Sequence, residues 1–398
     1  MKRGGSSSGG VSTEPAAGIT PPGRLRVTVI ASSAARGIEG KGMSGEVWRE
    51  PFQGQYGAIH PLQRPGLERF STDPSVRPPI HYLTGLLPVE HGHGTSTFQM
   101  PATGWLDIGT GTFGGAAPLF VADAPLTGAI ITGLPPGWIA TTSELSMSFL
   151  RAPNVRSGTF TGRATSVHAS RRVGAASVQV TDAAGRLVAH GTTRCMIVEV
   201  PGVLDVAPHD PAANGVRGRG TGTPPFQRTP TGRVLTPDEF DARSGRDLME
   251  GYVDGTIDPP PVAHLLGGRP TAVDGDSVAW TFPNTEWLCS PAPFLYGGAI
   301  AGMAETALAS AYTLAMEAGQ ICAPMDIKVQ FLRPVYPNTG DLAGHAEIVH
   351  AGRNVIVARG ELHDGAGKLV ALATGSALRV LAGVRRLLGD DPDALLVE

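Results

Sequence analysis

The chain has 398 residues, a formal net charge of −3 and 17% charged residues. Its length allows two or three domains, and this charge gives no basic field that would favour nucleic acid or an acidic membrane surface. No apolar run approaches the length that spans a bilayer. The three cysteines, Cys195, Cys289 and Cys322, are widely spaced, which argues against a disulfide framework or a zinc site. We expect a cytoplasmic protein with no nucleic-acid or membrane partner and no bound metal.

Residues 1–42 are rich in Gly, Ser, Ala and Pro, and we expect them to form a disordered N-terminal extension. The stretch 39–42 (EGKG) would be encoded by purine-rich codons, as a translated ribosome-binding site would be. We therefore hypothesise that natural synthesis starts at Met43.

The rest of the chain contains two similar copies of one sequence pattern. An ungapped shift carries one copy onto the other and aligns Pro79 with Pro261. Such a long period indicates two copies of one domain and not a solenoid. Other matched pairs are Gly85 with Gly267, Pro101 with Pro283, Trp105 with Trp287, Gly115 with Gly297, Phe149 with Phe331, His168 with His350 and Asp182 with Asp364. We place the domains at 43–200 and 246–383, a Pro- and Gly-rich linker without regular structure at 201–245, and a tail at 384–398.

Each copy is predicted to contain one long helix followed by an antiparallel meander of strands. A short helical segment and a Pro-Pro turn come first, then a strand-like stretch and the helix; the short segments are at 66–70 and 246–252. The second copy shows a helical run at 295–311 and β-type alternation at 325–333, 342–350, 355–363 and 369–380. Asp364 and Gly367 mark a hairpin turn between the last two strands. This order gives an α+β fold in which a sheet wraps around the helix.

The helix of the second copy opens with Gly297 and Gly298 and carries one acid, Glu305, in an otherwise apolar run. Glycines at a helix start leave backbone N–H groups bare and allow a ligand to approach closely. A buried carboxylate is costly unless it has a partner or a chemical role. On this helix alone, simple packing against the sheet is the favoured interpretation. The repeat places Asp123 of the first copy at the position of Glu305.

A set of motifs in the second copy extends this pattern. Residues 290–298 read SPAPFLYGG, and after Glu305 come FLRP at 331–334, HAGR at 350–353 and DGAGKLVA at 364–371. Together they resemble the PaaI-like acyl-CoA thioesterases of the hotdog superfamily, over about 246–381 and more weakly over 64–199. The sequence departs from the family pattern where Ser290 replaces Asn, Pro293 replaces Gly and Tyr296 replaces His.

The resemblance implies two tandem hotdog domains that form an intrachain pseudo-dimer. It also implies cleavage of an acyl-CoA thioester to a free acid and coenzyme A, without a cofactor, since coenzyme A is part of the substrate. Further association of double-hotdog units into a homo-oligomer is expected.

Thioester hydrolysis needs donors for the developing oxyanion and a group that attacks the substrate or activates water. A helix start could supply the donors and a carboxylate the second group. Gly297 and Glu305, however, lie about 12 Å apart along one helix. Two antiparallel helices, one from each half, bring the start of each beside the acid of the other.

Two composite sites are then predicted. Site one combines the following residues: Ser290, Tyr296, Gly297 and Gly298 of the second half with Asp123, Thr127 and Thr142 of the first. Site two combines Gly115 and Ala116 with Glu305, and there Ile108, Ala309 and Pro324 stand in place of the polar residues. Because site one keeps its polar groups, we favour Asp123 as the catalytic acid, with Glu305 as the alternative. Direct attack by the acid and activation of water both stay open.

Arg171, Arg172 and Arg353 follow strand ends in the two copies. The resemblance implies that basic residues near these turns meet the phosphates of coenzyme A, and Arg suits such contacts; a solvated turn is the alternative. Two other functions stay open. The loss of the family Asn and His allows a non-catalytic acyl-CoA-binding protein. A hotdog hydratase or dehydratase is the third candidate, but it would need a His beside the acid, and neither helix carries one.

Overall fold

The computed structural model describes residues 77–135, 137–199, 223–291 and 294–381. The predicted N-terminal extension, the helical segment at 66–70, the whole C-terminal tail and part of the linker lie outside the described residues. In the described part of the chain, no helix is long and apolar enough to cross a membrane.

The two halves contain the same elements in the same order. The first half consists of α2 (Pro79–Thr84), β1 (Leu87–Gly92), β2 (Thr95–Pro101), α3 (Ala116–Ile131), β3 (Trp138–Phe149), β4 (Thr159–Ala169), β5 (Val173–Thr181) and β6 (Leu187–Glu199). The second consists of α6 (Pro261–Leu266), β7 (Arg269–Asp274), β8 (Ser277–Phe282), α7 (Gly297–Leu314), β9 (Gln320–Phe331), β10 (Leu342–Ala351), β11 (Val355–His363) and β12 (Leu369–Leu381). The predicted repeat and its long helices and meanders are therefore present in the structure.

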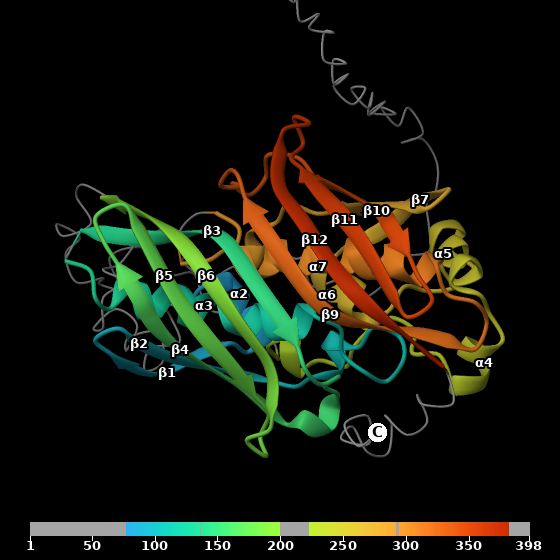
Figure 1. Cartoon of the computed structure of the whole chain (residues 1–398), viewed down its shortest axis with the longest axis horizontal. Coiled ribbons are helices and arrows are strands. Elements are labelled where there is room, and N and C mark those ends of the chain that lie inside the picture. The colour runs from blue at the N-terminus through green and yellow to red at the C-terminus, as the bar shows by residue number, and fades with distance from the viewer. Residues whose placement is uncertain (1–76, 136, 200–222, 292–293, 382–398) are drawn as a thin grey trace, which may run out of the picture. The chain divides into compact units, whose positions relative to one another are not determined.

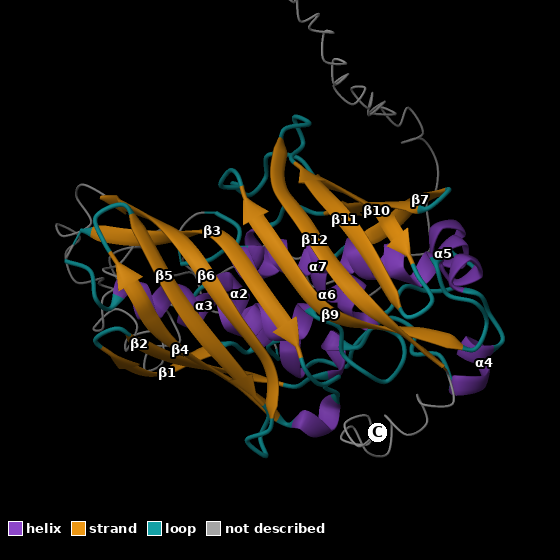
Figure 2. Cartoon of the chain, viewed as in Figure 1, coloured by secondary structure: helices purple, strands orange, loops and turns teal. Residues whose placement is uncertain are grey.

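The strands form one antiparallel sheet in the order β1-β2-β4-β5-β6-β3-β9-β12-β11-β10-β8-β7. The two halves join where β3 pairs with β9, and there Ser146 lies opposite Lys328, its own counterpart in the repeat. An approximate two-fold axis therefore passes through this pair. The helices α3 and α7 lie on one side of the sheet, behind the strands in Figure 1 and Figure 2.

The central helix of the first half is apolar on nearly all sides. Every residue of α3 except Ala124 and Thr127 is buried, because the sheet covers one side of the helix and α7 packs against another. A helix that is hydrophobic all round is typical of such a fully enclosed position. The two less buried residues mark the side that faces a cavity.

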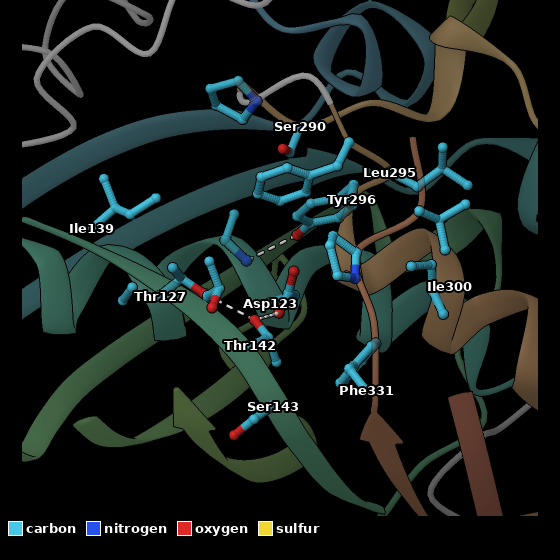
Figure 3. A pocket seen from close by; sticks show the side chains of 18 of the residues that line it. Asp123, Thr127, Ile139, Thr142, Ser143, Ser290, Leu295, Tyr296, Ile300 and Phe331 are labelled. Carbon is cyan, nitrogen blue, oxygen red and sulfur yellow. Dashed lines mark hydrogen bonds between the residues drawn. The ribbon is translucent and has the colours of Figure 1, made fainter. Parts of the chain in front are cut away.

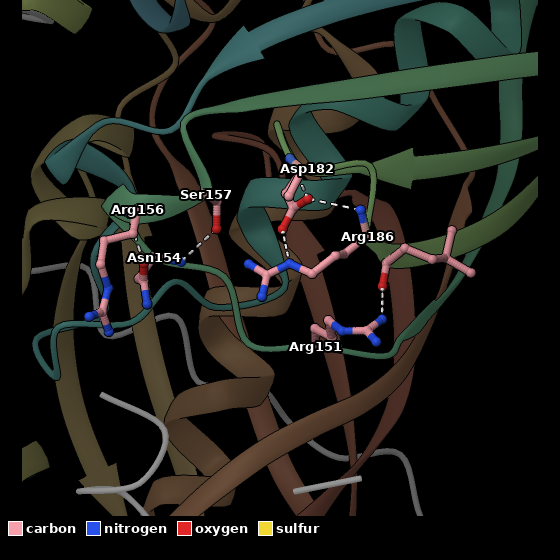
Figure 4. Close-up of polar contacts among 8 residues, drawn as sticks. Arg151, Asn154, Arg156, Ser157, Asp182 and Arg186 are labelled. Carbon is pink, nitrogen blue, oxygen red and sulfur yellow. Dashed lines mark hydrogen bonds and ion pairs between the residues drawn. The ribbon is translucent and has the colours of Figure 1, made fainter. Parts of the chain in front are cut away.

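The hairpin turns confirm the repeat in atomic detail. Asp182 Oδ1 accepts hydrogen bonds from the backbone N–H groups of Ala184 and Arg186 at 3.0 and 2.9 Å (Figure 4). Asp364 makes the same contacts with Ala366 and Lys368 at 3.0 and 2.9 Å. The glycine in each turn has a positive φ, +78° at Gly185 and +74° at Gly367, a conformation that favours glycine. The predicted turn at 364–367 is therefore confirmed.

Three sequence predictions are wrong in detail. β9 begins at Gln320 and not at 325, because Pro324 sits where the β9–β12 register shifts, a position that tolerates proline. The Pro-Pro stretches open the short helices α2 and α6, since proline suits the first helical turn. The segment 201–245 is not free of regular structure: it contains η5 (Pro225–Gln227) and α4 (Pro237–Asp241), and α5 (Gly245–Asp254) begins at its end.

Candidate active site

The start of each long helix lies beside the acid of the other. Asp123 Oδ2 on α3 accepts a hydrogen bond from the backbone N–H of Gly298 at 3.0 Å. Glu305 Oε1 on α7 accepts one from the backbone N–H of Gly115 at 2.9 Å. The structure therefore places the two helices antiparallel and brings both predicted acid–helix pairs together.

At site one, two hydroxyl groups form a chain behind the carboxylate. Thr142 Oγ1 on β3 donates to Asp123 Oδ1 at 2.8 Å and lies 3.3 Å from Thr127 Oγ1 (Figure 3). Since the Thr142 proton is directed at Asp123, the Thr127 hydroxyl is the donor to Thr142. One carboxylate oxygen is thus fixed by a side chain and the other by the helix start.

The absence of a side chain at Gly297 permits this close approach. A Cβ added at Gly297 would lie 2.7 Å from Asp123 Oδ2, closer than real Cβ contacts. Glycine is therefore required here by the position of the acid.

Burial controls the charge state of Asp123. Its side chain is 4% exposed, and desolvation raises its pKa from 3.8 to about 6, although the hydrogen bonds from Thr142 and Gly298 favour the ionised form. A carboxyl group with this pKa loses its proton between mildly acidic and neutral pH and can then act as a base.

Asp123 lines a cavity of about 480 Å³ with largely apolar walls. The apolar lining includes Ile80, Phe98, Ile131, Ile139, Ile300 and Phe331. β3 pairs with β9 only over residues 144–148. The cavity lies where the two strands separate, because residues 139–143 and 331–336 both contribute to its wall. The Asp123 carboxylate therefore faces a cavity in which an apolar group can be held.

The other predicted residues of site one differ in what they contact. Ser290 and Tyr296 both line the cavity, and their contact with substrate stays a prediction. The hydroxyl of Tyr296, however, is engaged by the backbone of α3. It accepts a hydrogen bond from the Ala124 N–H at 2.8 Å (Figure 3) and donates one to the Phe120 carbonyl at 2.8 Å.

The structure separates the three predicted arginines. Arg171 and Arg172 lie in the exposed turn between β4 and β5. The Ile197 N–H donates to the Arg172 carbonyl at 3.0 Å, which places this turn beside Met196, a residue of the cavity wall. The side chains of these arginines do not line the cavity among the residues described.

Arg353 lies in the second half of the chain, away from the turn that carries Arg171 and Arg172. It lies in the turn between β10 and β11, and the neighbouring Val355 pairs with Leu378, which lines a second cavity. The two-fold arrangement thus places the turn of Arg353 near the cavity of its own half, and contact of Arg353 with substrate stays a prediction.

Site two contains Glu305, and among the residues that the structure describes no hydroxyl group is hydrogen-bonded to it. Its cavity of about 340 Å³ includes Ile108, Ala309 and Pro324, at the positions held by polar residues in site one. Thr306, Ser310 and Thr313 also line it, but their hydroxyls donate to carbonyls of their own helix. Side chains of the segment between the halves complete the wall: Phe240, Leu248, Met249 and Tyr252.

Glu305 is expected to make folding pH-dependent. Its side chain is 3% exposed, and desolvation raises its pKa from 4.5 to about 7, against the opposing hydrogen bonds from Gly115 and Ala116. A raised carboxyl pKa stabilises the fold at low pH, and this contribution is lost as the pH rises through about 7. Between pH 5 and 8, the unfolding free energy of the wild type should fall by about 2 kcal/mol more than that of Glu305→Gln. Urea unfolding at both pH values measures this; parallel pH dependences would contradict it.

Sequence reasoning missed His81. The short helix α2 brings this residue into the wall of the first cavity, where its ring packs edge-on against Phe98 at a centroid distance of 6.1 Å. It is 4% exposed; burial, with a smaller contribution from Arg77, lowers its pKa to about 3. The imidazole is therefore neutral at pH 7. The only signal in the sequence is the asymmetry of the repeat, which has Ala263 at the equivalent position.

Among the described residues, no group of three or more His, Cys, Asp or Glu side chains is placed to hold a metal ion. Two closely spaced histidines, His91 and His93, lie where β1 ends and the β1–β2 turn begins, and His91 Nδ1 lies 2.9 Å from Ser96 Oγ.

One long helix wrapped by an antiparallel sheet, present twice and joined edge to edge, defines a tandem hotdog protein. The predicted fold is thus confirmed. The family model described as the thioesterase superfamily matches residues 292–371, and the model of the acyl-CoA thioesterase C-terminal domain matches residues 76–197. The chain belongs to the thioesterase superfamily.

Solved structures of thioesterases are similar to this chain. A phenylacetic acid degradation-related putative thioesterase from Ralstonia eutropha JMP134 is 32% identical, with 33% of this chain and 98% of that chain covered and a TM-score of 0.31. A putative thioesterase from Novosphingobium aromaticivorans DSM 12444 is 15% identical, with 73% and 97% covered and a TM-score of 0.46. The acyl-CoA thioesterase II TesB2 from Mycobacterium marinum is 13% identical, with 76% and 98% covered and a TM-score of 0.45. No curated protein matches the sequence.

Proposed function

We propose that this chain hydrolyses an acyl-CoA thioester to a free acid and coenzyme A at site one. The observation that carries the proposal is the Asp123 carboxylate against the Gly298 N–H, in a cavity with apolar walls. Membership of the thioesterase superfamily and the match to an acyl-CoA thioesterase domain support the same reaction.

The Gly298 N–H supplies the oxyanion donor in this proposal. Without substrate, this N–H is occupied by Asp123 Oδ2. The thioester carbonyl oxygen takes over the donor, which frees Oδ2 while Thr142 still holds Oδ1. The N-terminus of α7 then stabilises the negative charge that develops on the carbonyl oxygen.

The freed carboxylate oxygen activates water. Asp123 Oδ2 takes a proton from the water as the water oxygen bonds to the carbonyl carbon; the C–S bond then breaks, and the coenzyme A thiolate recovers the proton from Asp123. Direct attack by Oδ2 would instead form an anhydride with Asp123, which water hydrolyses. After a single turnover in H₂¹⁸O, ¹⁸O in the Asp123 carboxylate would establish the anhydride route, because only attack of water at the Asp123 carbonyl of an anhydride places the label there.

The position of the β4–β5 turn suggests where the rest of the substrate lies. We place the acyl chain against the apolar wall and the coenzyme A phosphates near Arg171 and Arg172, whose turn adjoins that wall. No cofactor enters this scheme. Association of double-hotdog units and a cytoplasmic location stay predictions.

Release of free thiol from a panel of acyl-CoAs tests the proposed function. Turnover of at least one chain length, with one thiol released for each thioester consumed, is expected. Binding of acyl-CoA without any thiol release would favour the non-catalytic alternative. His81 in the same cavity as Asp123 is the observation that favours a hydratase. Loss of the double bond of an enoyl-CoA without thiol release would establish that reaction instead.

The activity should rise with pH as Asp123 ionises. Because only the carboxylate can act as base or nucleophile, kcat/KM is expected to be half-maximal near pH 6, the pKa of about 6 that burial gives Asp123. Thr142→Val removes a donor to the ionised form and should raise this midpoint by about 1 pH unit. A pH–rate profile of both proteins measures the shift. If the midpoint of the profile is unchanged in Thr142→Val, the ionisation that controls activity is not that of Asp123.

A further inference from the structure

Helix α3 contains a proline immediately beyond the catalytic turn. Pro125 has no N–H to donate to the Val121 carbonyl, and its ring crowds that carbonyl. A Cβ added at Gly162 of β4 would lie 2.8 Å from the Val121 oxygen and 3.2 Å from Pro125 Cγ. Gly162 therefore leaves the space into which this turn of α3 opens.

The hydroxyl of Tyr296 occupies the neighbouring hydrogen-bond position. In an uninterrupted helix the Ala124 N–H would donate to the Phe120 carbonyl. Here the Ala124 N–H donates to the Tyr296 hydroxyl, and that hydroxyl donates to the Phe120 carbonyl, both at 2.8 Å. A side chain from the other half of the chain thus bridges this N–H and this carbonyl with two hydrogen bonds, on the turn that carries Asp123.

The same residue begins the opposing helix. Tyr296 is the N-cap of α7, two positions before Gly298, whose N–H binds Asp123. Its ring is 5% exposed, and burial raises the pKa of the phenol well above its usual value. The hydroxyl therefore keeps the proton that it donates to α3. One side chain links the opened turn of α3 to the start of α7.

Site two lacks both parts of this arrangement. The repeat places Gly114 at the position of Tyr296 and Ala307 at the position of Pro125. The opened turn and the tyrosine therefore occur together, and only beside the acid that keeps its threonine partners.

We propose that Tyr296 is a positioning residue: its hydroxyl closes the turn opened by Pro125 and so holds the Asp123 carboxylate against the Gly298 N–H. This inference rests on the proposed function for its effect on turnover, and it assigns the Tyr296 hydroxyl to α3 and not to the substrate. The phenol acts through Asp123, so its loss should change kcat and the ionisation of the acid, with little change in KM.

Tyr296→Phe removes the hydroxyl and keeps the ring in the cavity wall. We expect kcat to fall about 10-fold, the scale of one lost hydrogen bond, with KM changed less than about 2-fold. In a Pro125→Ala background α3 can close its own hydrogen bonds, so Tyr296→Phe should then have a much smaller effect. Tyr312→Phe is the matched control: Tyr312 is a buried tyrosine of the second cavity, and its loss should leave kcat unchanged.

Two readouts do not depend on turnover. Amide hydrogen exchange at Ala124 should become about 10-fold faster in Tyr296→Phe and stay unchanged in Tyr312→Phe. The pKa of Asp123, followed by ¹³C NMR, should rise in Tyr296→Phe because the Gly298 N–H bond to the ionised form weakens. Unchanged exchange and an unchanged pKa would overturn the inference, as would a raised KM with an unaltered kcat. If no acyl-CoA is hydrolysed, the proposed function fails, and these two readouts still decide whether Tyr296 positions Asp123.

Discussion

Asp123→Asn is expected to lower kcat for acyl-CoA hydrolysis by about 10³-fold, within the range that a general base contributes. An amide can accept the hydrogen bond from the Gly298 N–H but cannot take a proton from water or attack the thioester. The fold should persist, because burial already favours the uncharged form of this side chain. Thiol release gives kcat, and thermal unfolding shows that the variant is folded.

Glu305→Gln is the matched control, since Glu305 occupies the equivalent position at the start of the other helix. It should change kcat by less than about 3-fold, because its cavity has Ile108, Ala309 and Pro324 where site one has hydroxyl groups. If Glu305→Gln abolishes turnover and Asp123→Asn does not, the assignment of the two sites is reversed.

Gly297→Ala should lower kcat by about 10²-fold, the cost of a misplacement of about 1 Å in a catalytic group. The new Cβ would lie 2.7 Å from Asp123 Oδ2, so the carboxylate must move away from the helix start. The acid itself is intact in this variant, which makes the loss a test of geometry and not of charge. Steady-state kinetics at a pH well above 6 measures it with Asp123 ionised.

The control for this variant is Gly115→Ala at the start of α3. Its added Cβ would lie 2.5 Å from Phe149 Cζ and 3.0 Å from Glu305 Oε1, so it is crowded to a similar degree. We expect it to lower the melting temperature but to leave kcat per folded molecule nearly unchanged. A loss of kcat equal to that of Gly297→Ala would contradict the assignment of hydrolysis to one site.

The repeat makes the architecture predictable. An ungapped shift makes Asp123 equivalent to Glu305, and the pseudo-dimer that the hotdog resemblance implies then predicts that Asp123 lies beside the helix start at Gly298. Clear alternation places strands well: 355–363 matches Val355–His363. The start of β9 escapes prediction because Pro324 is a poor strand residue, and only the register shift in the sheet makes it acceptable there.

The parts that could not be predicted depend on three-dimensional packing. His81 lies far from Asp123 in the sequence, and only the path of α2 brings it into the cavity wall. Arg353 resembles Arg171 in motif, but the two-fold arrangement places it beside the other cavity. Pro125 in α3 is visible in the sequence; the hydroxyl that bridges its neighbouring turn comes from residue 296, and no local pattern indicates that contact.

The central claim is that one composite site, built from both halves, carries the reaction. A crystal structure with a coenzyme A thioether analogue tests it most directly. We predict one analogue per chain, with its sulfur beside Asp123 and the Gly298 N–H and its acyl chain in the first cavity. An analogue seated beside Glu305 and Gly115, or one in each cavity, would contradict the claim.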